Sequence, residues 1–295
     1  MLKIQGILPP MITPFKDNGE VDYDAYVYNV RKWAATGLSG LLVLGSNSET
    51  AFLTEEEKLE CVRLAVENAN GKLIMVGSGM ETAPATIALT NKCADLGAQC
   101  ALILPPNYYD SAMSTQALVE FFTEVADGSK IPILLYNVPK FTHVVMKPEL
   151  VSILAKHPNI IGMKDSTGDI PGFASFMRAC KGEDFSMIVG TASALYPALC
   201  LGAAGGILAL ANCNPNECVQ VYDLYHAGKL QEACDLYQRI FPINTAVTGT
   251  YGIPGLKIAC DFMGFKGGYP RKPLQRRSEA DKEAIRDILK TAGVL

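Results

Sequence analysis

The sequence predicts a single (β/α)8 barrel, a TIM barrel, with a helical extension at its C-terminal end. Eight short apolar runs recur along the chain, helical patterns separate them, and only helical patterns follow the eighth run. The 295 residues are 49% hydrophobic and 19% charged, a composition that suits one large buried core. We expect the barrel over residues 1–224 and the helical extension over residues 225–295.

The eight predicted strands are apolar along their length, as strands covered on both faces are. They span residues 6–12, 40–45, 73–77, 100–105, 131–137, 160–164, 186–190 and 205–210. Predicted helices lie between them, at residues 22–35, 54–69, 83–96, 114–127, 147–156, 170–181 and 191–201. The helix at 54–69 opens on Thr54 with Glu57 three residues later, which is the pattern of a capping box.

Composition argues against several classes of function. The net charge of −4 is spread along the chain without a basic block, so we expect no binding to nucleic acid. Nine cysteines and three histidines form no metal-binding pattern, and we expect neither a metal nor a disulfide. The uncharged stretch 185–216 is divided by glycines and prolines, which favours a barrel interior over a membrane span. Without a secretory signal pattern, we expect a cytoplasmic protein.

The carboxyl ends of the strands meet at one face of such a barrel, and chemistry takes place there. Lys164 and Tyr136 end neighbouring predicted strands, so an amine and a phenol should face one pocket. An amine that loses its charge through desolvation can attack a carbonyl, and a phenol can transfer the protons that this reaction needs. In the other interpretation, which stays open from the pattern alone, Lys164 pairs with Asp165 or reaches water.

Six stretches together resemble one family. The stretches GILPPMITPF, GLLVLGSNSE, LPPNYY, YNVP, IIGMKDSTGD and GAAGGILALAN, in this order between about residues 5 and 212, are similar to the dihydrodipicolinate synthase/N-acetylneuraminate lyase family. Its members are pyruvate-type Schiff-base aldolases on a TIM barrel with a helical tail. The resemblance implies a 2-oxo acid substrate, no cofactor beyond the lysine imine, and a homotetramer built as a dimer of dimers.

The resemblance also implies roles for individual residues. Lys164 would form the imine and Tyr136 would move protons, while Ser46 would link Tyr136 to Tyr108 of a neighbouring subunit. Contacts to the substrate would come from Asn47, Ser48, Ser166, Gly190 and Leu208.

Two departures bear on the substrate. Synthases that use aspartate semialdehyde usually carry an arginine where this chain has Phe141. Sialic acid lyases usually carry an acidic pair where Thr191 and Ala192 follow Gly190. The motifs are most similar to the 4-hydroxy-2-oxoglutarate aldolase branch, although that branch has glycine at the position of Ser48, so this side chain would either crowd the carboxylate pocket or add a hydroxyl contact.

The leading hypothesis is a class I aldolase that cleaves or forms a 4-hydroxy-2-oxo acid, with pyruvate or glyoxylate as product or co-substrate. The alternatives are a 4-hydroxy-tetrahydrodipicolinate synthase, an N-acetylneuraminate or 2-keto-3-deoxy sugar acid lyase, and a non-catalytic 2-oxo acid binding protein. A phosphosugar isomerase is a further alternative, for which Glu49 is the one available base at the strand ends.

Overall fold

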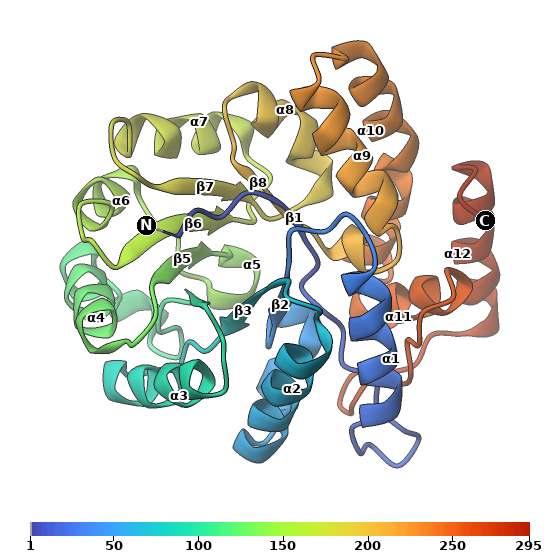
Figure 1. Cartoon of the computed structure of the whole chain (residues 1–295), viewed down its shortest axis with the longest axis horizontal. Coiled ribbons are helices and arrows are strands. Elements are labelled where there is room, and N and C mark those ends of the chain that lie inside the picture. Colours follow the sequence, from blue (N-terminus) through green and yellow to red (C-terminus); the bar gives the residue numbers. More distant parts are fainter. Residues whose placement is uncertain (1) are drawn as a thin grey trace.

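The computed structural model describes residues 2–295 and confirms the predicted TIM barrel with a C-terminal helical part (Figure 1). Its eight parallel strands are β1 (Gly6–Leu8), β2 (Gly40–Val43), β3 (Leu73–Gly77), β4 (Cys100–Ile103), β5 (Ile133–Asn137), β6 (Ile160–Asp165), β7 (Ser186–Val189) and β8 (Gly205–Ile207). Each lies within or beside a predicted apolar run, in the sheet order β1-β8-β7-β6-β5-β4-β3-β2.

The barrel closes between β1 and β2 beyond the regular end of β1. Pro9 and Pro10 have no N–H to donate, so the β1 ladder stops at Leu8 and the predicted strand at 6–12 is shortened. The segment after β1 then pairs with β2. Leu42 N donates to the carbonyl of Pro9 at 3.0 Å, and Met11 N donates to the carbonyl of Leu42 at 2.9 Å. The two prolines therefore keep the seam closed without extending the strand.

Helices surround the sheet. They are α1 (Tyr23–Ala34), α2 (Glu55–Asn68), α3 (Ala83–Asp95), α4 (Thr115–Gly128), α5 (Pro139–Thr142), α6 (Pro148–Leu154), α7 (Ile170–Ala179), α8 (Leu195–Cys200) and α9 (Pro215–His226). The capping box of α2 is confirmed, because Glu57 N donates to Thr54 Oγ1 at 3.2 Å and Thr54 N donates to Glu57 Oε2 at 2.9 Å. The short helix α5 follows β5 and was not predicted.

The remaining helices lie on one side of the barrel, in orange to red in Figure 1. They are α10 (Leu230–Thr245), α11 (Gly252–Phe262) and α12 (Glu279–Thr291). The predicted boundary between residues 224 and 225 falls inside α9, which contacts both β1 and α10. The expectation that only helical patterns follow the eighth run is wrong in one place, because residues 264–278 between α11 and α12 form no helix.

Two buried clusters make up the core. Side chains that point into the barrel, such as Leu42, Leu134 and Ile188, form one cluster, and the larger cluster fills the layer between sheet and helices. The uncharged stretch 185–216 supplies both, since it contains β7, α8 and β8. Among residues 2–295, no helix is both long and apolar enough to cross a membrane.

Candidate active site

A cavity of about 660 Å³ opens at the carboxyl ends of the strands. The loops after the strands form one part of its wall, and the segment around α11 together with residues 274–277 forms the other. Eight predicted site residues line it, namely Ser46, Asn47, Tyr136, Phe141, Lys164, Ser166, Gly190 and Thr191. The fold therefore brings together residues that are far apart in the sequence.

An irregularity in β6 turns Lys164 toward the cavity. Ile133 of β5 pairs with Ile160, but the next residue, Leu134, pairs with Gly162, so that Ile161 is skipped. This bulge shifts the alternation of side chains by one residue, and Tyr136 and Lys164 become direct neighbours across the two strands. The register, and not the apolar run alone, therefore makes the lysine face the phenol.

Lys164 and Tyr136 are in contact and almost buried. The Nζ of Lys164 donates to the Oη of Tyr136 at 3.4 Å and lies 4.4 Å from the centre of the phenol ring. The two residues are 3% and 5% exposed. The alternative in which Lys164 pairs with Asp165 is wrong, since Asp165 accepts hydrogen bonds from Asn137 and Thr167 instead, each at 2.7 Å.

The surroundings of Tyr136 change the acidity of its phenol. Burial alone would raise the pKa of Tyr136, but the ammonium group of Lys164 and the nearby hydroxyls of Ser166 and Ser46 lower it, and the net direction is downward. The hydroxyl of Ser166 is buried and has no hydrogen-bond partner among residues 2–295, so it acts on the phenol as a nearby dipole. A phenol of this kind gives up its proton more readily than a free tyrosine.

Ser166 and Gly190 are matched to each other. A Cβ atom added at Gly190 would lie 1.8 Å from the Oγ of Ser166, so only glycine leaves room for this hydroxyl. Gly190 N also donates to the carbonyl of Asp165 at 2.6 Å, which ties the end of β7 to the end of β6. The unpartnered hydroxyl of Ser166 therefore remains beside Lys164 on the cavity wall.

Three predicted site residues do not line this cavity. The hydroxyl of Ser48 donates to the carbonyl of Met11 at 2.5 Å, which shows that it neither crowds the pocket nor faces it. Leu208 is fully buried in the core between sheet and helices. Tyr108 is 78% exposed on the loop after β4, where its ring meets that of Tyr109 edge to face. Its place near the cavity of a neighbouring subunit remains a prediction.

Sequence reasoning missed three charged residues of the cavity wall, two of which come from the C-terminal part. Arg276 and Arg277 come from the non-helical segment after α11, and Lys140 comes from the unpredicted helix α5. A π-helical turn at Ala246–Thr250 supplies a further part of the wall. The stretch RKPLQRR, with four basic residues around one proline, is a signal that could have drawn attention to this segment.

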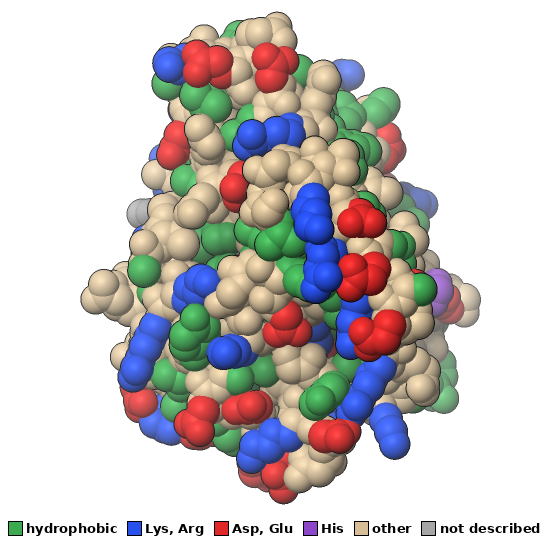
Figure 2. Space-filling model, turned by 90° about the vertical axis from the view of Figure 1, so that its right-hand side faces the viewer, with side chains coloured by type: hydrophobic (Ala, Val, Ile, Leu, Met, Phe, Trp, Pro, Cys, Tyr) green, Lys and Arg blue, Asp and Glu red, His purple; other side chains and the backbone are tan. Residues whose placement is uncertain are grey.

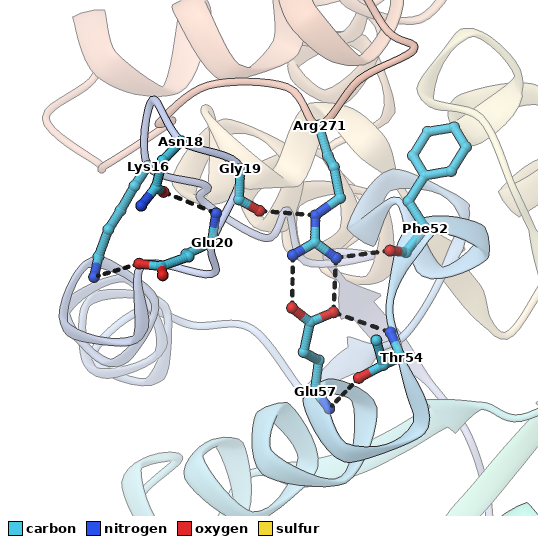
Figure 3. A network of polar contacts seen from close by, with 8 residues as sticks. All are labelled: Lys16, Asn18, Gly19, Glu20, Phe52, Thr54, Glu57 and Arg271. Carbon is cyan, nitrogen blue, oxygen red and sulfur yellow. Dashed lines mark hydrogen bonds and ion pairs between the residues drawn. The ribbon is translucent and has the colours of Figure 1, made fainter.

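A polar network fastens this segment to the barrel, as Figure 3 shows for Arg271. The guanidinium of Arg271 forms two hydrogen bonds with the carboxylate of Glu57, at 2.6 and 2.7 Å. It also donates to the carbonyls of Phe52 at 2.7 Å and Gly19 at 2.9 Å. Arg271 thus connects the C-terminal segment to α2 and to the loop before α1.

Beside this network lies a buried ion pair between Lys257 of α11 and Glu49 of the loop after β2. Their side chains are 1% and 0% exposed, and Nζ lies 2.5 Å from Oε1, although the angle is not that of a hydrogen bond. The other carboxylate oxygen of Glu49 accepts from Arg271 N at 2.8 Å. Glu49 is therefore tied to the C-terminal part, directly behind Ser46 and Asn47, and does not line the cavity.

Comparisons with known proteins agree with this geometry. The family model described as "Dihydrodipicolinate synthetase family" matches residues 3–292. The chain belongs to this family. The 4-hydroxy-tetrahydrodipicolinate synthase of Methanoculleus marisnigri is 36% identical over 98% of this chain and 99% of the relative. The crystal structure of the chloride-inhibited dihydrodipicolinate synthase of Acinetobacter baumannii with pyruvate superposes with a TM-score of 0.94 at 28% identity, covering 99% and 100% of the two chains.

A second relative, the 4-hydroxy-tetrahydrodipicolinate synthase of Methanothrix thermoacetophila, is 33% identical over 97% of this chain and 96% of its own. These names match the synthase alternative and not the 4-hydroxy-2-oxoglutarate aldolase branch. Members of the family are Schiff-base enzymes that use pyruvate without a metal ion. Within residues 2–295, no group of three or more His, Cys, Asp or Glu side chains is placed to hold a metal.

Proposed function

We propose that the protein is a class I aldolase that cleaves or forms a 4-hydroxy-2-oxo acid through an imine on Lys164. The observation that carries this proposal is the contact between the buried Lys164 amine and the Tyr136 phenol in the strand-end cavity. Membership in the family supports the same chemistry. The substrate that we propose is a small 2-oxo acid, with pyruvate or glyoxylate as one product.

The proposed cleavage begins when Nζ of Lys164 attacks C2 of the 2-oxo acid and water leaves, which forms an iminium ion. Tyr136, as phenolate, takes the proton of the C4 hydroxyl, the bond between C3 and C4 breaks, and its electron pair moves into the iminium to give an enamine. The aldehyde leaves, C3 is protonated, and water hydrolyses the imine to release pyruvate. The lowered pKa of Tyr136 favours the phenolate that this step needs.

In the proposed site, Asn47 and the backbone around Ser46 hold the substrate carboxylate, and the Ser166 hydroxyl donates to it or to the C2 oxygen. The buried and unpartnered state of the Ser166 hydroxyl supports this role, because burying a polar group without a partner is unfavourable. Tyr108 would enter the site of a neighbouring subunit, which requires at least a dimer and fits the homotetramer implied by the family resemblance. Its 78% exposure leaves the ring free to do so.

Specific contacts argue against three alternatives. A phosphosugar isomerase needs a base, but Glu49 is buried against Lys257 outside the cavity. A sugar acid lyase would gain little from Thr191 and Ala192, which carry no carboxylate to bind sugar hydroxyls. A protein that only senses 2-oxo acids has no use for a phenol held against its lysine.

A second candidate function is the condensation of pyruvate with aspartate semialdehyde, as in a 4-hydroxy-tetrahydrodipicolinate synthase. The names of the relatives from Methanoculleus marisnigri and Methanothrix thermoacetophila favour it. The position of Phe141, where such synthases usually carry arginine, speaks for the aldolase instead.

An assay panel tests the proposal. Purified protein would be given 4-hydroxy-2-oxoglutarate, a 2-keto-3-deoxy sugar acid, and pyruvate with aspartate semialdehyde, while release or use of pyruvate is followed. We expect the fastest turnover with the 4-hydroxy-2-oxo acid and none in Lys164→Ala. Faster turnover with aspartate semialdehyde would establish the synthase instead, and full activity in Lys164→Ala would rule out the imine mechanism.

A further inference from the structure

The cavity carries an excess of positive charge. Among the described residues that line it, none is an aspartate or glutamate, and four are cations, namely Lys140, Lys164, Arg276 and Arg277. This excess is local, because the whole chain has a net charge of −4 and acidic and basic side chains are mixed on the face that carries the C-terminal helices (Figure 2). A cavity lined in this way favours an anionic substrate.

The four cations fall into two groups. Lys164 lies at the bottom, 3% exposed beside Tyr136. Lys140, Arg276 and Arg277 lie at the rim and come from α5 and from the segment before α12. In the proposed mechanism, Asn47 and the backbone around Ser46 bind the carboxylate next to C2 of the substrate. The three rim cations therefore have no role in the mechanism described above.

The rim cations differ in how far they are already neutralised. Arg276 forms an ion pair with Asp17, and its guanidinium stacks 3.7 Å from the centre of the Tyr269 ring. Arg277 has no ion pair with any described carboxylate. Its Nε and one Nη donate to the carbonyl of Tyr251, at 3.0 and 2.7 Å, and the other Nη has no partner among the described residues.

Lys140 is the second rim cation without an ion pair among the described residues. Its Nζ donates to the carbonyl of Thr248 at 3.2 Å and retains two further N–H groups. Thr248 belongs to the π-helical turn Ala246–Thr250, and Tyr251 follows directly, so Lys140 and Arg277 are both attached to this turn. The turn therefore holds two half-satisfied cations at the mouth of the cavity.

We infer that Arg277, assisted by Lys140, binds a carboxylate at the far end of the aldehyde portion of the substrate. The inference rests on the proposed aldolase function and names its substrate class, an aldehyde that carries an acid group. A guanidinium forms directional hydrogen bonds with a carboxylate, and an ammonium group forms such bonds less well. The C-terminal segment thereby supplies the cation that is absent at Phe141.

The test compares acidic aldehydes with their neutral methyl esters. The aldehydes are glyoxylate, succinic semialdehyde and the methyl ester of each, and every one is condensed with pyruvate in a separate assay. The assays use the full-length protein and its variants Arg277→Gln, Arg277→Lys and Lys140→Gln. We expect the wild type to prefer one acid over its ester and Arg277→Gln to lower kcat/KM for that acid roughly 10- to 100-fold, with little change for the ester. Lys140→Gln and Arg277→Lys should show smaller losses.

The matched control is Arg286→Gln, because Arg286 lies in the same C-terminal part, pairs with Glu283 at 3.0 Å and does not line the cavity. It should keep the wild-type preference. Thermal unfolding of each variant identifies any loss of folding. If Arg277→Gln does not fold, the ratio of kcat/KM for the acid to kcat/KM for the ester in Arg277→Lys and Lys140→Gln decides the matter. An unchanged preference for the acid in folded variants overturns the inference.

Two further measurements separate a failure of this inference from a failure of the proposed function and from phosphate binding. Glyceraldehyde 3-phosphate is included, and a preference for it that depends on Arg277 would overturn the carboxylate assignment in favour of a phosphate. Trapping of the pyruvate imine with borohydride is measured in every variant. Absence of the imine in the wild type would remove the proposed function itself, whereas an imine without dependence on Arg277 would overturn this inference alone.

Discussion

Lys164 and Lys257 are both buried lysines, but their partners differ. Lys257, 1% exposed, lies 2.5 Å from the carboxylate of Glu49 and donates to the carbonyls of Thr13 at 2.8 Å and Tyr269 at 2.7 Å. Lys164, 3% exposed, has the Tyr136 phenol at 3.4 Å and no ion pair with any described carboxylate. The first amine is surrounded by three oxygen atoms, whereas the second faces a cavity.

The difference indicates what a buried lysine needs in order to react. An amine that donates two hydrogen bonds and is paired with a carboxylate has no free direction for attack and serves to join parts of the chain. An amine that is not paired with a carboxylate and faces a cavity has a free direction from which it can reach a carbonyl. Burial alone does not separate the two roles, but the partners do.

The largest effect should follow replacement of Lys164. We expect Lys164→Met to lower kcat/KM by about 10⁴-fold or more, because the covalent step is lost. Its free energy of unfolding should change by less than about 2 kcal/mol, since no carboxylate is left unpaired. Steady-state kinetics and urea unfolding would check both expectations, and activity above one hundredth of the wild type would break the comparison.

The opposite pattern is expected for Lys257. Lys257→Met should lower the free energy of unfolding by about 3–5 kcal/mol, because Glu49 would remain buried without its cation. The double variant Lys257→Met with Glu49→Gln should recover part of this loss. Urea unfolding of the three proteins tests it, and a single variant as stable as the wild type would show that the pair does not hold the C-terminal part in place.

Tyr136 sharpens the comparison on the catalytic side. We expect Tyr136→Phe to reduce kcat by about 100-fold, because the proton transfer loses its positioned group while the imine can still form. Imine trapping together with kcat separates the two steps. Loss of the imine itself in Tyr136→Phe would mean that the phenol acts earlier than we propose.

The pKa of Tyr136 provides a second test of the contact between Lys164 and Tyr136. Because its pKa is lowered mainly by the ammonium of Lys164 against the effect of burial, the phenolate should form below the pH at which free tyrosine ionises. In Lys164→Met, burial remains and the cation is gone, so this titration should move to higher pH. Phenolate absorbance, with Tyr136→Phe subtracted, measures the direction, and a downward movement would contradict it.

The smallest effect is expected at Arg271, which supports the Lys257 pair from outside. Arg271→Gln removes the two bonds to Glu57 and should destabilise the protein by about 1–3 kcal/mol. Arg63→Gln is a suitable comparison, because Arg63 pairs with Glu60 and Glu67 on the exposed face of α2 and should change stability by less than about 1 kcal/mol. Equal effects of the two would remove Arg271 from the fastening network.

The strands were predictable because both faces of a parallel sheet are buried, so each strand is a continuous apolar run. The pattern could not separate the two lysines, since Lys164 follows IIGM and Lys257 stands in GLKIAC, both apolar surroundings. The bulge at Ile161, which makes Lys164 face Tyr136, has no sequence signal of its own.

Contacts across long stretches of chain also escaped prediction. Arg276 and Arg277 reach the cavity because Arg271 is fixed to α2 and Lys257 to Glu49, and these contacts join residues more than 200 positions apart. Ser48 and Leu208 were placed in the site by resemblance, but local geometry directs the hydroxyl of Ser48 to Met11 and buries Leu208 in the core. Side-chain direction in a short turn depends on its neighbours in space.

Borohydride reduction in the presence of pyruvate, followed by mass spectrometry of the peptides, tests the difference between the two lysines most directly. We expect one pyruvyl adduct on the peptide that contains Lys164 and none on the peptide that contains Lys257. An adduct on Lys257, or no adduct on Lys164 in the folded protein, would contradict it.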